Sequence, residues 1–311
     1  MRAIVFPGQG SQFVGMGKDL ANSFVKAKRV FEEVNDALNQ DLYKIMTEGP
    51  EEELILTENA QPAIMAVGIA MIRVLKEEGY NINQFSNITS GHSLGEYTSL
   101  TAAESITLCD SSKLLKIRGQ AMQNAVPKNK GIMAAVLGLN IDEVENALEF
   151  DYGGICEVAN DNAKEQIVIS GQVEAVTNAI EGLLNIGAKK VIKLPVSAPF
   201  HCSLMMPAKE KMVEELKKIN LTSPLIPVIS NFTAEPTRDT KLLKENLINQ
   251  VDGMVRWREI MQKIVKLGFK EIVEFGSGSV LINLAKRNSP SLNRLSICDS
   301  NSLQEFIKKL S

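Results

Sequence analysis

Two kinds of apolar segment alternate along the chain and predict an α/β fold. Residues 3–6 (Ala-Ile-Val-Phe) form a short, wholly apolar run typical of a buried strand. Over 18–38 the apolar residues instead recur every three or four positions, which predicts a helix with one buried stripe. The segment 61–78 is apolar around most of its circumference, so we expect a central helix there, with Pro62 in its first turn.

The middle of the chain predicts a separate small domain. A turn-rich stretch at 127–131 (Pro-Lys-Asn-Lys-Gly) is followed by strands and helices in the order β-α-β-β-α-β, the ferredoxin-like pattern. The predicted strands are 132–137, 155–159, 166–170 and 190–194, and the predicted helices are 141–149 and 173–184. We therefore expect a ferredoxin-like domain over residues 128–195, inserted into a larger domain made of residues 1–127 and 196–311.

The stretch Gly91–Glu96 (Gly-His-Ser-Leu-Gly-Glu) is the main candidate for chemistry. The pattern Gly-x-Ser-x-Gly sets a serine on a sharp turn between a strand and a helix, because glycine on either side removes clashing Cβ atoms. The backbone N–H groups at the helix start can hold an oxyanion. An idle serine in a glycine-bracketed turn has the same form, so the pattern alone does not decide. Residues 87–90 before it are more polar than a buried parallel strand, which puts the edge of the sheet in question there.

A second glycine-rich loop follows the first strand. Residues 7–12 (Pro-Gly-Gln-Gly-Ser-Gln) resemble a nucleotide loop, but Phe13 stands where a dinucleotide fingerprint needs glycine. The P-loop pattern fails as well, because Gln12 replaces its first glycine and Asp19 follows Gly17-Lys18. What remains is a flexible turn that can bring the backbone N–H of Gln9 close to a reacting atom.

Composition excludes several partner classes. The chain has 311 residues, 44% of them hydrophobic, and a net charge of −3, so neither nucleic acid nor an anionic membrane is an expected partner. No apolar stretch is long enough to span a membrane, and no signal peptide is evident. Lysine clusters such as Lys189-Lys190 fit either a solvated surface or a docking patch for an acidic partner.

The cysteines and histidines narrow the chemistry further. The cysteines are far apart in the sequence and form no Cys-x-x-Cys pair, which argues against a zinc site and against disulfides. We therefore expect reduced, buried thiols in a cytoplasmic protein. The four are Cys109, Cys156, Cys202 and Cys298. Only two histidines are present, His92 and His201. His92 is adjacent to Ser93, but neighbours on such a turn point in different directions, so we expect it to be structural.

Four motifs together resemble one family. They are Pro7–Gln12, Gly91–Glu96, Arg118–Gln123 (Arg-Gly-Gln-Ala-Met-Gln) and Ser197–His201 (Ser-Ala-Pro-Phe-His). In this order and approximate spacing they resemble the malonyl-CoA:acyl-carrier-protein transacylases of fatty acid synthesis and the acyltransferase domains of polyketide synthases. The resemblance covers nearly the whole chain. It implies an α/β-hydrolase-like large domain, with the substrate in the cleft between it and the small domain.

The resemblance also implies roles for individual residues. Ser93 would be the nucleophile that carries the malonyl group as an ester, and His201 its base. The main-chain carbonyl of Gln250 would orient that histidine, and the backbone N–H groups of Gln9 and Leu94 would form the oxyanion hole.

The malonyl group itself would be recognised by Arg118, whose guanidinium can grip a free carboxylate through two parallel hydrogen bonds. Phe200 would crowd an α-methyl group, and Gln61 and Asn162 fall at positions of family pocket residues. The implied partners are malonyl-CoA and an acyl carrier protein that brings the phosphopantetheine thiol, with no cofactor or metal of the chain's own. A polyketide acyltransferase acting in trans and a plain serine esterase or thioesterase remain alternatives, as does a carrier-protein docking subunit without activity.

Overall fold

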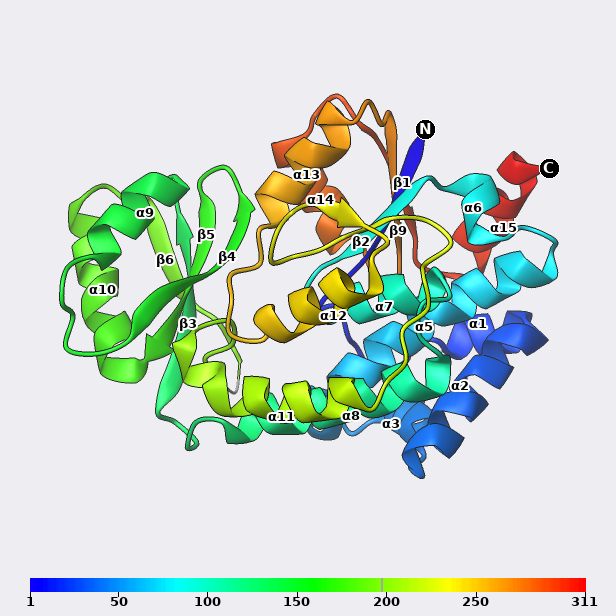
Figure 1. Ribbon diagram of the computed structural model, residues 1–311, viewed down its shortest axis with the longest axis horizontal. Helices are drawn as coiled ribbons and strands as arrows, with labels where there is room; N and C mark the ends of the chain where they lie inside the picture. Colours follow the sequence, from blue (N-terminus) through cyan, green and yellow to red (C-terminus); the bar gives the residue numbers. More distant parts are fainter. Residues whose placement is uncertain (197) are drawn as a thin grey trace.

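The computed structural model describes residues 1–196 and 198–311, so Ser197 of the fourth motif lies outside the described residues. The described chain is a mixed α/β protein with two sheets, one of six strands and one of four. In Figure 1 the four-stranded sheet, with α9 and α10, lies at the left, apart from the larger sheet and its helices.

The larger sheet is mainly parallel and has the order β10-β9-β1-β2-β7-β8. Its strands are β1 (Arg2–Phe6), β2 (Ile88–Gly91), β7 (Val228–Ile229), β8 (Pro236–Thr237), β9 (Glu271–Phe275) and β10 (Asn293–Ile297). Neighbouring strands are parallel except β7 and β8, which pair antiparallel. The carboxyl ends of β1, β2 and β7 therefore meet at one edge of the sheet, where ligand sites of parallel sheets form.

The polar residues 87–90 made the place of strand β2 in the sheet questionable, and the structure shows where it lies. It lies inside the sheet between β1 and β7, with Thr89 and Ser90 fully buried. The hydroxyl of Ser90 donates a hydrogen bond of 2.9 Å to the main-chain carbonyl of Ile229 on β7. A polar side chain is tolerated in this central strand because the neighbouring strand supplies its partner.

Helices surround the larger sheet, some packed on its strands and others on those helices (Figure 1). They are α1 (Lys18–Ser23), α2 (Val25–Leu38), α3 (Leu42–Glu48), α4 (Glu51–Leu54), α5 (Thr57–Glu77), α6 (Ile82–Phe85), α7 (Gly95–Ala102), α8 (Leu108–Asn124), the 3₁₀ turn Ser203–Met205, α11 (Met206–Lys217), α12 (Thr240–Asn249), α13 (Trp257–Lys266), α14 (Val280–Asn288) and α15 (Ser300–Leu310). As predicted, α5 is central and buried along most of its length.

Two helix boundaries differ from the sequence prediction. Helix α5 begins at Thr57, so Pro62 lies beyond its first turn, because Asn59 and Ala60 already donate to the carbonyl of Leu56. The predicted helix 18–38 is two helices, α1 and α2. Phe24 separates them in an extended conformation (φ −135°, ψ 116°).

The smaller sheet is antiparallel and has the order β4-β5-β3-β6. Its elements are β3 (Gly131–Leu137), α9 (Ile141–Leu148), β4 (Cys156–Ala163), β5 (Gln166–Gln172), α10 (Val173–Asn185) and β6 (Lys190–Lys193). One face packs with α9 and α10 around a core of its own that includes Val136, Val144 and Ile169. Strand β4 faces α13, where buried Asp161 pairs with Arg258 at 2.7 Å and joins this unit to the larger sheet.

The cysteines are free but not all buried. Cys202 is buried, Cys156 is partly buried, and Cys109 and Cys298 are exposed, so the expectation of buried thiols is wrong for the last two. Within residues 1–196 and 198–311, no helix combines the length and the apolar character needed to cross a bilayer.

Candidate active site

Ser93 sits on a strained turn between β2 and α7. Its φ is +52°, in the left-handed region that side-chain-bearing residues rarely adopt. A Cβ atom on Gly91 would stand 2.0 Å from the carbonyl oxygen of Gly95, and one on Gly95 would stand 2.3 Å from that of Phe6. Only glycine fits at these two positions. The Gly-x-Ser-x-Gly pattern therefore has the structural meaning expected of it.

His201 contacts the serine hydroxyl. Its Nε2 lies 2.8 Å from Ser93 Oγ. On the other side of the ring, Nδ1 lies 2.9 Å from the main-chain carbonyl of Gln250 and 3.2 Å from that of Gly253. Because carbonyls only accept, Nδ1 carries the proton and Nε2 is free to accept one from Ser93. The contact predicted for the Gln250 carbonyl is present in the structure.

The electrostatics keep this histidine neutral. Burial, followed by the positive charge of Arg118, lowers the pKa of His201 to about 3. A neutral imidazole is the form that accepts a proton, so the group is in its base form at neutral pH.

The glycine-rich loop lies against the serine turn. The backbone N–H of His92 donates to the carbonyl of Phe6 at 3.0 Å, and a Cβ on Gly8 would stand only 2.8 Å from the His92 carbonyl oxygen. Leu94 directly precedes α7, whose N-terminus is positive. Within the described part of the chain, the backbone N–H groups of Gln9 and Leu94 donate to no protein atom.

Arg118, on α8, also contacts the hydroxyl of Ser93. Although it carries a charge, it is only 1% exposed. Its Nη2 donates to Ser93 Oγ at 3.1 Å and to Gln250 Oε1 at 2.9 Å, and its Nη1 donates to Gln61 Oε1 at 2.8 Å. The guanidinium also lies 5.7 Å from the centre of the Tyr97 ring. It is held beside the nucleophile, while its Nε–H has no partner among the described residues.

A close helix contact makes this position possible. Helices α5 and α8 carry Gln61 and Arg118, and a Cβ on Gly119 would stand 2.5 Å from the Cα of Glu58 at the start of α5. Glycine next to Arg118 in the motif therefore lets the two helix backbones approach.

His92 and Asn162 contact each other. Nε2 of His92 lies 2.8 Å from Oδ1 of Asn162 on β4, and the His92 ring lies 5.6 Å from that of Trp257. These contacts fit the structural role expected for His92. Asn162 faces His92. Among the described residues, its side chain makes no hydrogen bond with Arg118. Phe200 is buried immediately before His201.

Sequence reasoning missed two residues of the site. Asn231 accepts the backbone N–H of Ser93 at 2.6 Å and donates to the carbonyl of Gly91 at 2.7 Å. Glu96, fully buried, accepts the backbone N–H of Asn231 at 2.9 Å and Nε2 of Gln250 at 2.8 Å. A sequence signal existed for Glu96, which belongs to the serine motif. Asn231 closely follows β7, and only the pairing of β7 with β2 brings it to the site.

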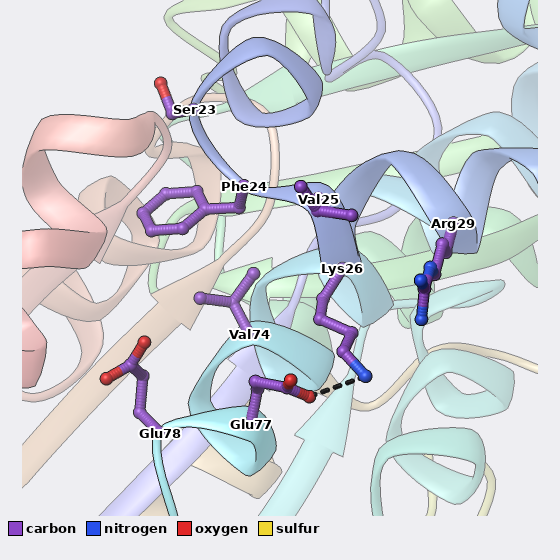
Figure 2. A pocket seen from close by; sticks show the side chains of 8 residues that line it. All are labelled: Ser23, Phe24, Val25, Lys26, Arg29, Val74, Glu77 and Glu78. Carbon is purple, nitrogen blue, oxygen red and sulfur yellow. Dashed lines mark ion pairs between the residues drawn. The ribbon is translucent and has the colours of Figure 1, made fainter.

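A surface pocket lies elsewhere, at the start of α2 and the end of α5 (Figure 2). Its lining includes Phe24, Val74 and the ion pair Lys26–Glu77, whose charged atoms are 2.7 Å apart. None of its lining residues contacts Ser93, so it is separate from the candidate site. Among the described residues, no three His, Cys, Asp or Glu side chains gather as a metal site.

Comparisons with known proteins identify the family. The family model of the acyl transferase domain matches residues 3–300. Malonyl CoA-acyl carrier protein transacylase of Bacillus subtilis (strain 168) is 39% identical over 310 residues, or 99% of this chain and 96% of that protein. The crystal structure of acyl-carrier-protein-S-malonyltransferase from Bartonella henselae is 45% identical, has a TM-score of 0.97 and covers 99% of each chain.

A third relative was solved with a partner. It is a malonyl-transacylase in complex with a type II PKS acyl-carrier protein, with 36% identity, a TM-score of 0.95 and 99% of each chain covered. These matches confirm the family predicted from the four motifs. Because they extend over nearly the entire chain and not only its serine turn, the protein belongs to the acyl transferase family.

Proposed function

We propose that the protein transfers a malonyl group from malonyl-CoA to the phosphopantetheine thiol of an acyl carrier protein, through a malonyl ester of Ser93. The observation that carries this proposal is the buried guanidinium of Arg118, 3.1 Å from Ser93 Oγ. Two relatives support it: one named malonyl CoA-acyl carrier protein transacylase, matched over 96% of its length, and another solved with a carrier protein.

The first half-reaction follows from the geometry. Ser93 Oγ attacks the thioester carbonyl carbon while its proton passes to His201 Nε2, 2.8 Å away. The carbonyl oxygen becomes an oxyanion held by the backbone N–H groups of Gln9 and Leu94. When the intermediate collapses, the C–S bond breaks and the coenzyme A thiolate takes the proton from His201. The thiol of the carrier protein then attacks the ester in the reverse sequence and regenerates Ser93.

Arg118 supports the choice of acyl group. Malonyl differs from acetyl by a free carboxylate, and a guanidinium whose hydrogen-bond partners among the described residues are all uncharged oxygens can bind that group. Leaving a buried guanidinium without an anion is unfavourable, so acetyl-CoA should be the poorer substrate. Gln61, in contact with Arg118, and Phe200, next to His201, would complete the pocket. The reaction requires no cofactor of this chain. We retain Asn162 as a candidate pocket residue.

The finer description of the fold belongs to this proposal. The order β4-β5-β3-β6 and the two helices on one face support a ferredoxin-like domain over residues 128–195. The serine turn between a strand and a helix supports an α/β-hydrolase-like domain over residues 1–127 and 196–311. A cytoplasmic location, expected from the cysteine pattern, also stays a prediction.

A transfer assay separates the alternatives. The enzyme is incubated with radiolabelled malonyl-CoA and holo acyl carrier proteins of the fatty acid and polyketide types, and carrier-bound malonyl and free malonate are measured. We expect label on a carrier thiol. Preference for the polyketide carrier would favour a polyketide acyltransferase acting in trans, release of free malonate alone would favour a thioesterase, and no turnover would indicate a docking subunit. Competition with methylmalonyl-CoA tests the role of Phe200.

A further inference from the structure

Glu96 is a buried carboxylate next to the site but outside its reacting atoms. Its side chain on α7 is fully buried, and burial raises its pKa to about 7. No ion pair joins it to a cation within the described residues. A buried carboxylate without a direct ion pair is unfavourable, so its two hydrogen bonds, from Gln250 and from the backbone of Asn231, deserve an explanation.

The first of these bonds fixes the side-chain amide of Gln250. Nε2 of that amide is surrounded by acceptors: Glu96 Oε2 at 2.8 Å, the Ser93 carbonyl at 3.0 Å and Asn231 Oδ1 at 3.4 Å. Its Oε1 receives Nη2 of Arg118 at 2.9 Å. If the amide were rotated by half a turn, its oxygen would face three acceptors and its NH₂ group would face the NH₂ group of the Arg118 guanidinium. The chemistry of the surroundings therefore allows one orientation only.

This orientation holds Arg118 without neutralising it. An uncharged amide oxygen, and not a carboxylate, contacts the guanidinium, so the positive charge stays available to an acyl group that carries its own carboxylate. Glu96 stands one residue further away and supplies the acceptor that keeps the amide turned.

We propose that Glu96 is a positioning residue that acts through Gln250 to hold the Arg118 guanidinium for the substrate carboxylate. The inference rests on the proposed malonyl transfer. In this role Glu96 contributes to the selectivity for an acyl group with a free carboxylate, and does not take part in acyl transfer itself. It also explains why a carboxyl side chain is buried at the start of α7 beside the nucleophile.

The test compares kcat/KM for malonyl-CoA with that for acetyl-CoA in Glu96→Met. This variant keeps the approximate length of the side chain but removes the oxygen, Oε2, that accepts from both Gln250 and Asn231. We expect the malonyl-to-acetyl ratio to fall about tenfold, the effect of weakening one hydrogen bond to a charged group, mainly through a higher KM for malonyl-CoA. A purely structural role would lower both activities together and leave the ratio unchanged.

Two further variants make the result decisive. Glu274→Gln is the control. Glu274 is another buried carboxylate, lies away from the site and accepts the backbone N–H of Ile282 at 2.9 Å, so this variant should keep the wild-type ratio. Gln250→Met removes the amide but keeps the main-chain carbonyl that faces His201, and should lower the ratio like Glu96→Met. It decides the question if Glu96→Met does not fold.

The outcomes separate this inference from the proposed function. An unchanged or higher ratio in Glu96→Met, with wild type still forming malonyl-enzyme, would mean that the positioning role is wrong and that malonyl transfer stands. Where Glu96→Met does not fold, the same result in Gln250→Met has the same meaning. If wild type forms no malonyl-enzyme, the proposed function fails and this inference fails with it.

Discussion

At the scale of single residues, Arg118 influences both Ser93 and His201. Its charge contributes to the low pKa of His201, about 3, and its Nη2 donates to Ser93 Oγ. In the proposed reaction a bound malonyl carboxylate would offset part of that charge and raise the pKa of His201, while burial remains the larger cause of its low value. The same side chain would then link recognition of the acyl group to activation of the serine.

Arg118→Ala tests this link. We expect kcat/KM for malonyl-CoA to fall by about two orders of magnitude, because a buried charge-assisted contact is lost, while acetyl-CoA turnover falls less or increases. The check is steady-state kinetics with both thioesters. Arg73→Ala, at a partly exposed arginine paired with Glu33 on the surface, serves as the control. An unchanged malonyl-to-acetyl preference would remove Arg118 from the site.

Much of the site was predictable from the sequence, because its parts are short motifs with fixed local geometry. Ser93, His201 and Arg118 are mutually placed as their motifs implied, and the Gln250 carbonyl contacts the histidine. Asn231 was missed because its role depends on which strand lies beside β2. Such pairing is a tertiary property that no local pattern contains.

At the scale of elements, close backbone approaches at glycines assemble the site. Gly91 and Gly95 allow the serine turn to fold on itself, and Gly119 allows α8 to approach α5. Strands and helices of residues 131–193 lie close to their predicted bounds, except that β4, predicted over 155–159, continues to Ala163. The break at Phe24 and the early start of α5 escaped prediction, because neighbouring elements and not local propensity determine them.

Gly119→Ala tests the helix contact. A methyl group 2.5 Å from the Glu58 Cα must push α5 and α8 apart, which we expect to destabilise the protein by roughly 1–3 kcal/mol and to reduce malonyl transfer. Urea unfolding and the transfer assay measure the two effects. Gly153→Ala is the control, since its Cβ meets nothing within 4 Å and only the backbone conformation opposes it. Equal stability and activity in Gly119→Ala and wild type would contradict the account.

At the scale of the whole molecule, buried ionisable groups give folding a pH dependence. Burial raises the pKa of Glu274 to about 7 from an ordinary 4.5, so the folded state binds its proton more tightly than the unfolded state does. Between these two values Glu274 therefore makes stability fall as pH rises. The low pKa of His201 acts in the opposite direction and reduces stability as pH falls below 6.5.

Glu274→Gln isolates the first effect. Relative to wild type, the variant should gain stability between pH 5 and 8, on the order of 3 kcal/mol in total, because the cost of ionising a buried carboxyl is removed. Urea unfolding at several pH values measures this difference. Glu210→Gln, at an exposed carboxylate of α11, should follow wild type throughout. A constant difference between Glu274→Gln and wild type across this range would show that Glu274 does not carry the effect.

The most direct test of the central claim is the intact mass of the enzyme after brief exposure to malonyl-CoA without a carrier protein. Wild type should gain one malonyl group, mapped to the peptide that contains Ser93, and should lose it when holo acyl carrier protein is added. Ser93→Ala should gain nothing. A malonyl adduct of equal yield in Ser93→Ala, or carrier malonylation by that variant at the wild-type rate, would contradict transfer through the serine.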